Sequence, residues 1–259
     1  MLKTYLKRTP FGVKIIYSNL YQKIRHPDDY RKELEEYNFY KNLIQKINYK
    51  NDLIIDVGAN VGNKSNLFSK LADKVLAFEP STSIFPILKH RYKNSNVEVF
   101  NCALGSDNTN LDFYELKGNE WYSSLSKKHI ETTVTERKVT NPDLIKNKQV
   151  IVEKIENYIK KYGIPIYIKI DVEGYEYEVI RGLETAVPLI SFEANLPEFC
   201  QESINCINYL SSISSDKYMF NFTTDNFFLQ EHFVKTNDAI KFLVSTQLRY
   251  LEIYAQLMD

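Results

Sequence analysis

Residues 52–63, with the sequence DLIIDVGANVGN, constrain the fold of this chain more than any other segment. The first half is a short apolar run around one acid, Asp56, and the second half contains Gly58 and Gly62. A short apolar run that ends in glycines is typical of a buried strand entering a tight turn. The next residues, NKSNLFSKLADK, place apolar side chains at helical spacing. The segment therefore predicts the strand, turn and helix that open a nucleotide-binding βαβ unit.

The glycine turn also indicates the kind of ligand. Glycines let backbone N–H groups approach a ligand closely, and a helix N-terminus carries partial positive charge. Glu79 ends the second apolar run, KVLAFEP, where a carboxylate can accept hydrogen bonds from ribose hydroxyls. A dinucleotide site requires G-x-G-x-x-G, but Asn60 stands at the middle glycine position. The pattern favours a nucleoside-type cofactor with a ribose and no phosphates.

Charge and cysteine content narrow the class of protein. Among 259 residues, 33 basic side chains balance 33 acidic ones, which gives no general argument for nucleic-acid binding. The three cysteines show no CxxC spacing, so neither a disulfide framework nor a zinc site is expected. We see no signal-peptide pattern and no apolar run of the roughly 18 residues that span a bilayer. These features predict a cytoplasmic protein.

Residues 1–28 form a basic N-terminal arm, in which six lysines and arginines precede the first acid, Asp28. Apolar side chains such as Leu6, Ile16 and Leu20 lie between the basic ones. One interpretation is a solvated first helix that docks on the domain by its apolar side. The other is contact with an anionic membrane surface, at its inner face, or self-association with another copy of the chain.

Three further strands end in small or acidic residues. Residues 97–100 form the third predicted strand, and Cys102 and Ala103 follow it where a doubly wound sheet has its ligand crevice. Small side chains there suit a slot for a flat ring, although they are equally typical of a turn. The strands at 166–171 and 188–195 end in Asp171 and Glu193.

Lys169 is the unusual residue of the strand at 166–171, because a lysine in a central strand is costly to bury unless it is paired. It shares a face with Asp171 and is near enough in a sheet to meet Asp56 or Glu193. A buried structural ion pair is one interpretation, and a lysine that orients substrate or adjusts the acidity of a neighbour is the other. Glu173 follows directly in the turn, where carboxylates also serve as helix caps.

An insertion at about 112–150 interrupts the alternation of strands and helices. It begins with the strand pattern LDFYEL, a turn and a second short strand, WYSSLSK, and continues as a polar segment over 129–148. Insertions at the ligand end of a sheet often carry function. There are two interpretations of its aromatic residues, Phe113, Tyr114, Trp121 and Tyr122. They close a small satellite core, or they join the adjacent hydroxyls of Ser123 and Ser124 in a platform for a sugar or another flat apolar substrate.

Four motifs together resemble the FkbM-type methyltransferases: DVGANVGN, AFEP, FNCALG and IKIDVEGYEYEVIRG. The resemblance spans residues 29–257 and leaves out the arm and most of the insertion. It implies an α/β fold, a doubly wound, seven-stranded Rossmann-like sheet that is mostly parallel with its last strand antiparallel, and helices on both faces. It also implies one methyltransferase domain at 29–259 and S-adenosyl-L-methionine as the cofactor.

The resemblance also implies roles for individual residues. Glu79 would bind the ribose, Cys102 and Ala103 would border the adenine, and the remaining cofactor residues would hold the amino-acid part: Asp56, Gly58, Ala59, Asn60, Gly62 and Asn63. Family members methylate hydroxyl groups, often of saccharides in surface glycans or of natural products. Asp171 is the first candidate for positioning the acceptor or removing its proton, followed by Glu173, Lys169 and Glu193.

Two other functions remain open from the residues alone. An NAD-linked oxidoreductase would use a related sheet, but Asn60 and the carboxylate of Asp56 near a pyrophosphate speak against it. A cofactor-binding scaffold without turnover would act through the arm. The four histidines are scattered, so we predict no metal, and the absence of an N/D-P-P-Y motif argues against methylation of a base amino group.

Overall fold

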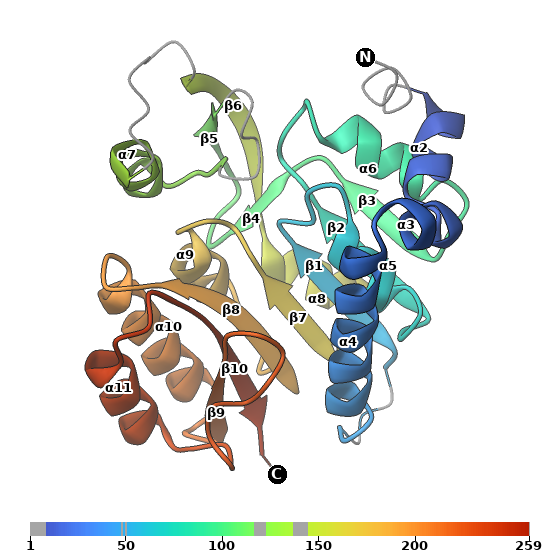
Figure 1. The fold of residues 1–259 in the computed structure, drawn as a ribbon. Coiled ribbons are helices and arrows are strands. Elements are labelled where there is room, and N and C mark those ends of the chain that lie inside the picture. The colour runs from blue at the N-terminus through green and yellow to red at the C-terminus, as the bar shows by residue number, and fades with distance from the viewer. Residues whose placement is uncertain (1–8, 48, 50, 117–122, 137–144, 259) are drawn as a thin grey trace.

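The computed structural model describes residues 9–47, 49, 51–116, 123–136 and 145–258. Its main feature is a seven-stranded sheet with the order β3-β2-β1-β7-β8-β10-β9 (Figure 1). Only β10 runs antiparallel, to β8 and to β9 on either side of it. The predicted mixed sheet is therefore confirmed. Its strands are β1 Leu53–Val57, β2 Lys74–Phe78, β3 Val97–Phe100, β7 Tyr167–Ile170, β8 Leu189–Asn195, β9 Tyr218–Thr223 and β10 Tyr250–Leu257.

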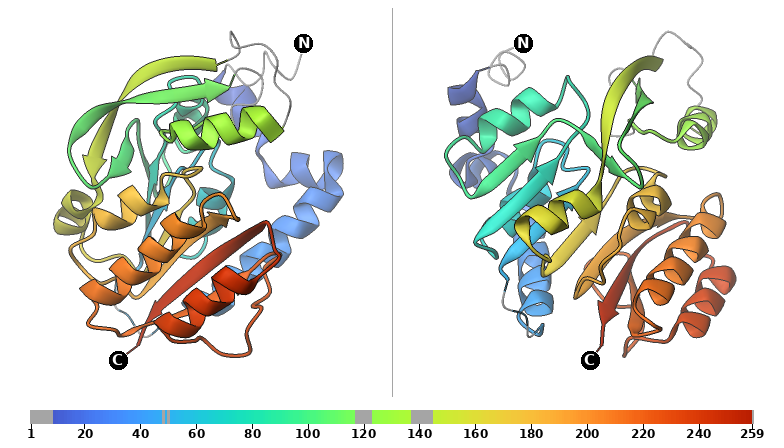
Figure 2. Two further views of the ribbon diagram at one scale, coloured as in Figure 1. Left: turned by 90° about the vertical axis from the view of Figure 1, so that its left-hand side faces the viewer. Right: turned by 180° about the vertical axis from the view of Figure 1, so that it is seen from behind.

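Helices cover both faces of this sheet, as predicted (Figure 2). The central strand β1 is buried along its whole length, which explains its continuous apolar run. Ile55 and Val57 belong to the core on one face, and Ile54 to the core on the other. The first core is covered by α8 Ile155–Tyr162, α9 Glu176–Arg181, α10 Cys200–Ile213 and α11 Thr236–Ser245, and the second by α4 Pro27–Ile44, α5 Asn63–Phe68 and α6 Phe85–Arg91.

The insertion forms a second sheet in the order β4-β6-β5. Its strands are β4 Ala103–Gly105, β5 Thr109–Leu116 and β6 Ile145–Lys154. The expectation of a β-rich insertion is met by β5 and β6, which pair antiparallel over eight residues. The expected strand WYSSLSK lies partly outside the described residues, and within them Ser124 makes one isolated bridge to Tyr114. The run QVIVEKI is a strand as expected, but it joins this second sheet.

The polar segment of the insertion differs from its prediction, because it contains the helix α7, Lys127–Glu136. The buried face of α7 carries His129, Ile130 and Thr133. Two of these three side chains are polar, so the segment lacks the apolar residues at helical spacing that predict a helix from sequence. The helix instead packs against the domain through contacts that include the rings of His129 and Phe199, whose centroids are 6.0 Å apart.

The described part of the arm contains α2 Pro10–Ile16 and α3 Asn19–Arg25. Val13 and Ile16 of α2 are buried, and α2 packs on α6. The interpretation that the arm docks on the domain by its apolar side therefore holds for α2. On α3, by contrast, Leu20 and Ile24 are exposed. Among the described residues, no helix is long and apolar enough to cross a membrane.

Candidate active site

The turn after β1 forms one wall of the candidate site. The backbone N–H groups of Gly58 and Ala59 both donate to the carbonyl oxygen of Phe78, at 3.1 and 2.9 Å, which ties the turn to the end of β2. Gly58 has a φ of 81°, in the left-handed region. A Cβ atom there would overlap the carbonyl oxygen of Asp171. Glycine is therefore required for the end of β7 to approach the turn.

Glu79 stands opposite this turn, as the sequence predicts. Its Oε2 accepts a hydrogen bond from the N–H of Asn60 at 2.9 Å, and its Oε1 accepts one from the N–H of Ser81 at 2.7 Å. The side chain is buried, and burial raises the pKa of Glu79 to about 7. Two backbone donors thus hold a carboxylate at the end of β2, with its ionisation close to neutrality.

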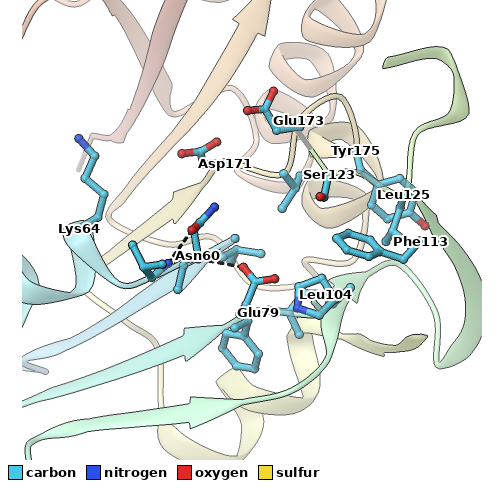
Figure 3. Close-up of a pocket in the computed structure, with 18 of the residues that line it drawn as sticks. Asn60, Lys64, Glu79, Leu104, Phe113, Ser123, Leu125, Asp171, Glu173 and Tyr175 are labelled. Carbon is cyan, nitrogen blue, oxygen red and sulfur yellow. Dashed lines mark hydrogen bonds between the residues drawn. The ribbon is translucent and has the colours of Figure 1, made fainter. Parts of the chain in front are cut away.

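A cavity opens between the turn, the ends of β2 and β7, and the insertion (Figure 3). Eight predicted site residues line it: Gly58, Ala59, Asn60, Asn63, Glu79, Ala103, Asp171 and Glu173. The sequence motifs therefore do converge on one space. Phe113 and Ser123, which the sequence suggests as an acceptor platform, line the same cavity as Glu79. Trp121 and Tyr122 lie outside the described residues.

Five predicted residues do not line this cavity: Asp56, Gly62, Cys102, Lys169 and Glu193. Gly62 begins α5, and its carbonyl oxygen accepts from the hydroxyl of Tyr92 at 2.5 Å. Cys102 lies in the core, with its Sγ 3.8 Å from the hydroxyl of Tyr158. Burial raises the pKa of the Cys102 thiol to about 12. This part of the chain therefore contributes Ala103 and Leu104 to the cavity lining, instead of the predicted pair of small residues Cys102 and Ala103.

Asp56 lies behind the turn and is buried. Its Oδ2 accepts from the hydroxyl of Ser65 at 2.5 Å, whereas its Oδ1 has no hydrogen-bond partner among the described residues. Burial raises the pKa of Asp56, and the charge of Lys169, its register partner on β7, opposes that shift. An unpaired buried carboxylate oxygen is costly, so this atom is a natural acceptor for a cationic or N–H group.

Lys169 anchors a cluster of acids at the ends of β7 and β8. It is buried, and its Nζ donates to the Oδ2 of Asp171 at 2.7 Å. Burial opposes its charge, but Asp171 and Glu193 outweigh burial and raise the pKa of Lys169. Burial, followed by the charge of Asp171, also raises the pKa of Glu193. Lys169 is thus the cation that holds Asp171 in place at the cavity wall.

Asp171, Glu173 and Glu193 each have a carboxylate oxygen within 4.8 Å of the others. Such a set of oxygens is suited to a divalent cation. Lys169 already supplies positive charge to Asp171, and the His129 Nε2 lies 3.3 Å from the Oε2 of Glu173. The expectation of a metal-free site stays a prediction.

Sequence reasoning missed several lining residues, chiefly Val61, Lys64, Leu104, Leu125 and Tyr175. Tyr175 lies within the motif IKIDVEGYEYEVIRG, so its neighbours could have drawn attention to it. Lys64 is an ordinary polar residue in the first turn of a helix, and Leu125 follows the insertion's predicted aromatic platform. Both adjoin segments that the sequence analysis singles out, but neither side chain carries a signal of its own.

The sequence model of the Methyltransferase FkbM domain matches residues 56–226. The chain belongs to the FkbM methyltransferase family. This match runs from the last two residues of β1 to just beyond β9, and therefore covers both the glycine turn and the acidic cluster. It also gives no support to the NAD-linked oxidoreductase that the residues alone left open.

Two curated relatives are similar over part of the chain. Hexuronic acid methyltransferase AglP of Haloferax volcanii is 24% identical over 143 residues, which are 55% of this chain and 54% of AglP. Ribosomal RNA small subunit methyltransferase A of Mesoplasma florum is 40% identical over 65 residues, which are 23% of this chain and 24% of that protein. The chain thus matches about half the length of one relative and a quarter of the other.

Similar solved structures include two methyltransferases of low sequence identity. The plantazolicin methyltransferase BpumL, in complex with a triazolic desmethylPZN analog and SAH, is 13% identical with a TM-score of 0.46, over 100% of this chain and 95% of that chain. The precorrin-6y C5,15-methyltransferase of Geobacter metallireducens is 12% identical with a TM-score of 0.40, over 83% of this chain and 87% of that chain.

S-adenosyl-L-methionine is the cofactor of this family member, and the site fits it. Glu79 offers a carboxylate to ribose hydroxyls, and its two backbone donors fix its orientation. Leu104 and Phe113 supply apolar surface for a flat ring in the same cavity. The Oδ1 of Asp56 is buried and lacks a hydrogen-bond partner among the described residues, although Asp56 does not itself line the cavity.

Proposed function

We propose that this chain is an S-adenosyl-L-methionine-dependent O-methyltransferase that methylates a hydroxyl of a saccharide, in a surface glycan or a natural product. The observation that carries the proposal is that Glu79 and Asp171 line one cavity. Glu79 suits the ribose of the cofactor, and Asp171 suits an acceptor hydroxyl. Family membership supports methyl transfer, and the name of AglP, a hexuronic acid methyltransferase, supports a saccharide acceptor.

The chemistry is an in-line displacement in which the cofactor supplies a methyl group bound to a positively charged sulfur. The acceptor oxygen forms the new C–O bond while the C–S bond breaks, and the hydroxyl proton must leave. Much of the rate enhancement of such a reaction comes from holding the three atoms in line. A carboxylate within hydrogen-bond distance of the hydroxyl also contributes by taking the proton.

Asp171 is the proposed group that orients the acceptor hydroxyl and receives its proton. It lies at the wall of the cavity, and one of its oxygens is held by Lys169. Lys169 is then a positioning residue, because its ammonium group donates a hydrogen bond to the Asp171 carboxylate and holds it at the cavity wall. Glu173 and Glu193 complete the proposed catalytic set through their proximity to Asp171. Lys169 and Glu193 are absent from the cavity lining, so their effects should pass through Asp171.

The remaining cofactor contacts are proposals of the same kind. We assign the amino-acid part to Asp56, Gly62 and the turn between them, and the adenine to the region of Ala103 and Leu104. Cys102 is proposed to act only by supporting Ala103, since its side chain lies in the core. The acceptor is proposed to be a small molecule or saccharide, without a nucleic-acid partner.

Methyl transfer from isotopically labelled cofactor to a panel of glycosides tests this function. The expected result is label in an alkali-stable methyl ether on a sugar oxygen, identified by mass spectrometry and NMR. Cofactor binding should be observed by calorimetry in the same preparation. Cofactor binding without transfer to any hydroxyl acceptor would leave a binding scaffold, and binding of NAD in its place would point to the oxidoreductase.

The N-terminal arm has a proposed role separate from that of the methyltransferase domain. The domain spans 29–259, and the arm at 1–28 contacts an anionic membrane or a second copy through α3. Leu20 and Ile24 are exposed on α3, and Lys23 and Arg25 follow in its last turn. Cosedimentation with phosphatidylglycerol vesicles should fall several-fold on Lys23→Glu. Equal sedimentation of both proteins would remove the membrane from the proposal.

A further inference from the structure

A second cavity lies beside the first one, on the side of β9 and β10. It is formed by side chains from α4, α5, the end of β9 with the loop after it, and the start of β10: Lys32, Glu36, Lys64, Thr223, Thr224, Asp225, Asn226, Tyr250 and Glu252. Lys64 also lines the first cavity. In the view of Figure 3, Lys64 and Phe113 lie on opposite sides of Asp171. The two cavities therefore meet at Lys64, with Asp171 between the insertion and this junction.

Side chains connect the second cavity to the proposed catalytic cluster. The hydroxyl of Tyr250, which lines the second cavity, donates to the Oε1 of Glu193 at 2.9 Å. Glu193 and Asp171 have oxygens within 4.8 Å of each other, and Asp171 lines the first cavity. The second cavity is thus linked through Tyr250 and Glu193 to Asp171, the residue that we propose to contact the acceptor hydroxyl.

The lining of the second cavity is almost entirely polar. Hydroxyl, amide and carboxylate side chains dominate, and Tyr250 is the one aromatic residue among those that line it. Such groups recognise a polyol, because each sugar hydroxyl can both donate and accept a hydrogen bond. The first cavity differs, since Leu104, Phe113 and Leu125 give it apolar surface.

The charges of the second cavity favour an uncharged ligand. Glu36, Asp225 and Glu252 supply three carboxylates against the two lysines. Lys64 forms an ion pair with Glu36, and the charge of Lys64 is therefore already compensated. Glu252 accepts from the hydroxyls of Ser191 and Tyr254, at 2.7 and 2.8 Å, which fixes it in place. An added carboxylate would meet more negative than positive charge here.

We propose that the second cavity binds the acceptor as an uncharged, hydroxyl-rich sugar ring and disfavours sugars that carry a carboxylate. The inference rests on the proposed function and extends it by locating the acceptor and its charge class. The inference also predicts that this chain prefers a different acceptor from that of a hexuronic acid methyltransferase. Asp225 and Thr224 are the residues that discriminate, because they line the cavity and stand outside the cofactor site.

Methyl glycosides of glucose, galactose, mannose and rhamnose, with the glucuronide and galacturonide as anionic counterparts, provide the test. The wild-type protein should methylate at least one neutral glycoside and prefer it over its uronide by tenfold or more in kcat/KM. Thr224→Val, which removes one hydroxyl at nearly constant volume, should raise the KM for that glycoside about threefold to tenfold. Asp225→Lys should lower the ratio of kcat/KM for the neutral glycoside to kcat/KM for the uronide about tenfold.

The control is Asp238→Lys, the same charge change on α11 outside the lining of both cavities. It should leave the ratio unchanged, and cofactor affinity by calorimetry should be the same in all variants. Saturation-transfer NMR with S-adenosylhomocysteine present should show the glycoside bound to wild type and weakened in Thr224→Val. If methyl transfer occurs but Asp225→Lys leaves the acceptor ratio unchanged, the inference is wrong and the proposed function still stands. A wild-type preference for uronides would have the same consequence. A lack of transfer to any hydroxyl overturns the proposed function as well.

Discussion

The two halves of the site are built in different ways. In the proposed cofactor half, backbone groups of the turn at 58–62 bind Glu79 and the end of β2, about 20 residues further along the chain. The proposed acceptor half gathers side chains from more distant segments, namely α4, α5, the end of β9 and β10. Backbone geometry therefore determines the shape of the first half, whereas charged and polar side chains determine the chemistry of the second. Changes of backbone freedom in the turn should damage cofactor binding, and changes of charge in the acceptor half should alter turnover or acceptor choice.

The largest effect that separates the two halves is expected from Asp171→Asn. Loss of the carboxylate removes the proposed proton acceptor, which should lower kcat by about 10²–10⁴-fold. Cofactor affinity should stay within about threefold, since Glu79 and the turn are unchanged. The measurement is single-turnover kinetics combined with calorimetry. Glu178→Gln, at a partly exposed acid on α9, is the matched control and should retain wild-type turnover.

A kcat for Asp171→Asn within a few-fold of wild type would remove Asp171 from the catalytic set. A large loss of cofactor affinity in the same variant would show that Asp171 belongs to the cofactor half instead. Thermal unfolding of both variants is needed beside these measurements, because the neutral amide of Asp171→Asn would leave the buried Lys169 without its anionic partner.

Gly58→Ala should break the cofactor half. The added Cβ would overlap the carbonyl oxygen of Asp171, and alanine is strained at a φ of 81°. We expect a loss of about 2–3 kcal/mol, which appears as a roughly 30–160-fold weaker cofactor affinity. Gly163→Ala is the control, since Gly163 also has positive φ but lies outside the lining of both cavities.

Gly163→Ala should lower the melting temperature and leave cofactor affinity unchanged. If Gly58→Ala affected only stability in the same way, the turn would have no special part in cofactor binding. The comparison between these two glycines thus separates general backbone strain from damage to the site.

Cofactor affinity should depend on pH through Glu79. Its pKa is raised to about 7, so the carboxylate is largely protonated at pH 6 and ionised at pH 8. If the ionised form accepts the ribose hydrogen bonds, affinity should fall about tenfold from pH 8 to pH 6. Calorimetry with 5′-deoxy-5′-methylthioadenosine measures this, because that ligand lacks the titrating amino-acid group of the cofactor.

Glu176 provides a matched control for the titration. Burial raises its pKa to about 7 as well, but Glu176 accepts from the N–H groups of Val172 and Gly174 and is absent from the cavity lining. Glu79→Gln should abolish the pH dependence, and Glu176→Gln should preserve it. The reverse pattern would assign the titration to the end of β7 and not to the ribose site.

The smallest expected effect is that of metal removal. Lys169 already balances Asp171, and we therefore expect EDTA to change the methylation rate by less than about twofold. Rates with and without added Mg²⁺ after gel filtration provide the measurement. Restoration of a lost rate by Mg²⁺ would show that Asp171, Glu173 and Glu193 bind a cation during turnover.

Much of the fold followed from hydrophobic patterning. The apolar run before Gly58 predicts a strand buried on both faces, and β1 is one. The strands predicted at 97–100 and up to Asn195 likewise correspond to β3 and β8. The helix α7 was missed because His129 and Thr133 occupy its buried face, where periodicity analysis looks for apolar residues. Polar groups can fill such a face when tertiary contacts satisfy them.

The sequence by itself determined the cofactor half, including Glu79 opposite a glycine turn, because these contacts are made by neighbouring backbone groups and two adjacent strands. It also placed Asp171 and Glu193 at strand ends. Only the tertiary structure decided that Cys102 is excluded from the cavity lining while Leu104, from the same core cluster, and Phe113 contribute to it. It likewise brought Lys64, Asp225 and Tyr250 around a second cavity. The physical reason is that side-chain contacts between distant segments depend on how helices pack on the sheet, which local spacing does not encode.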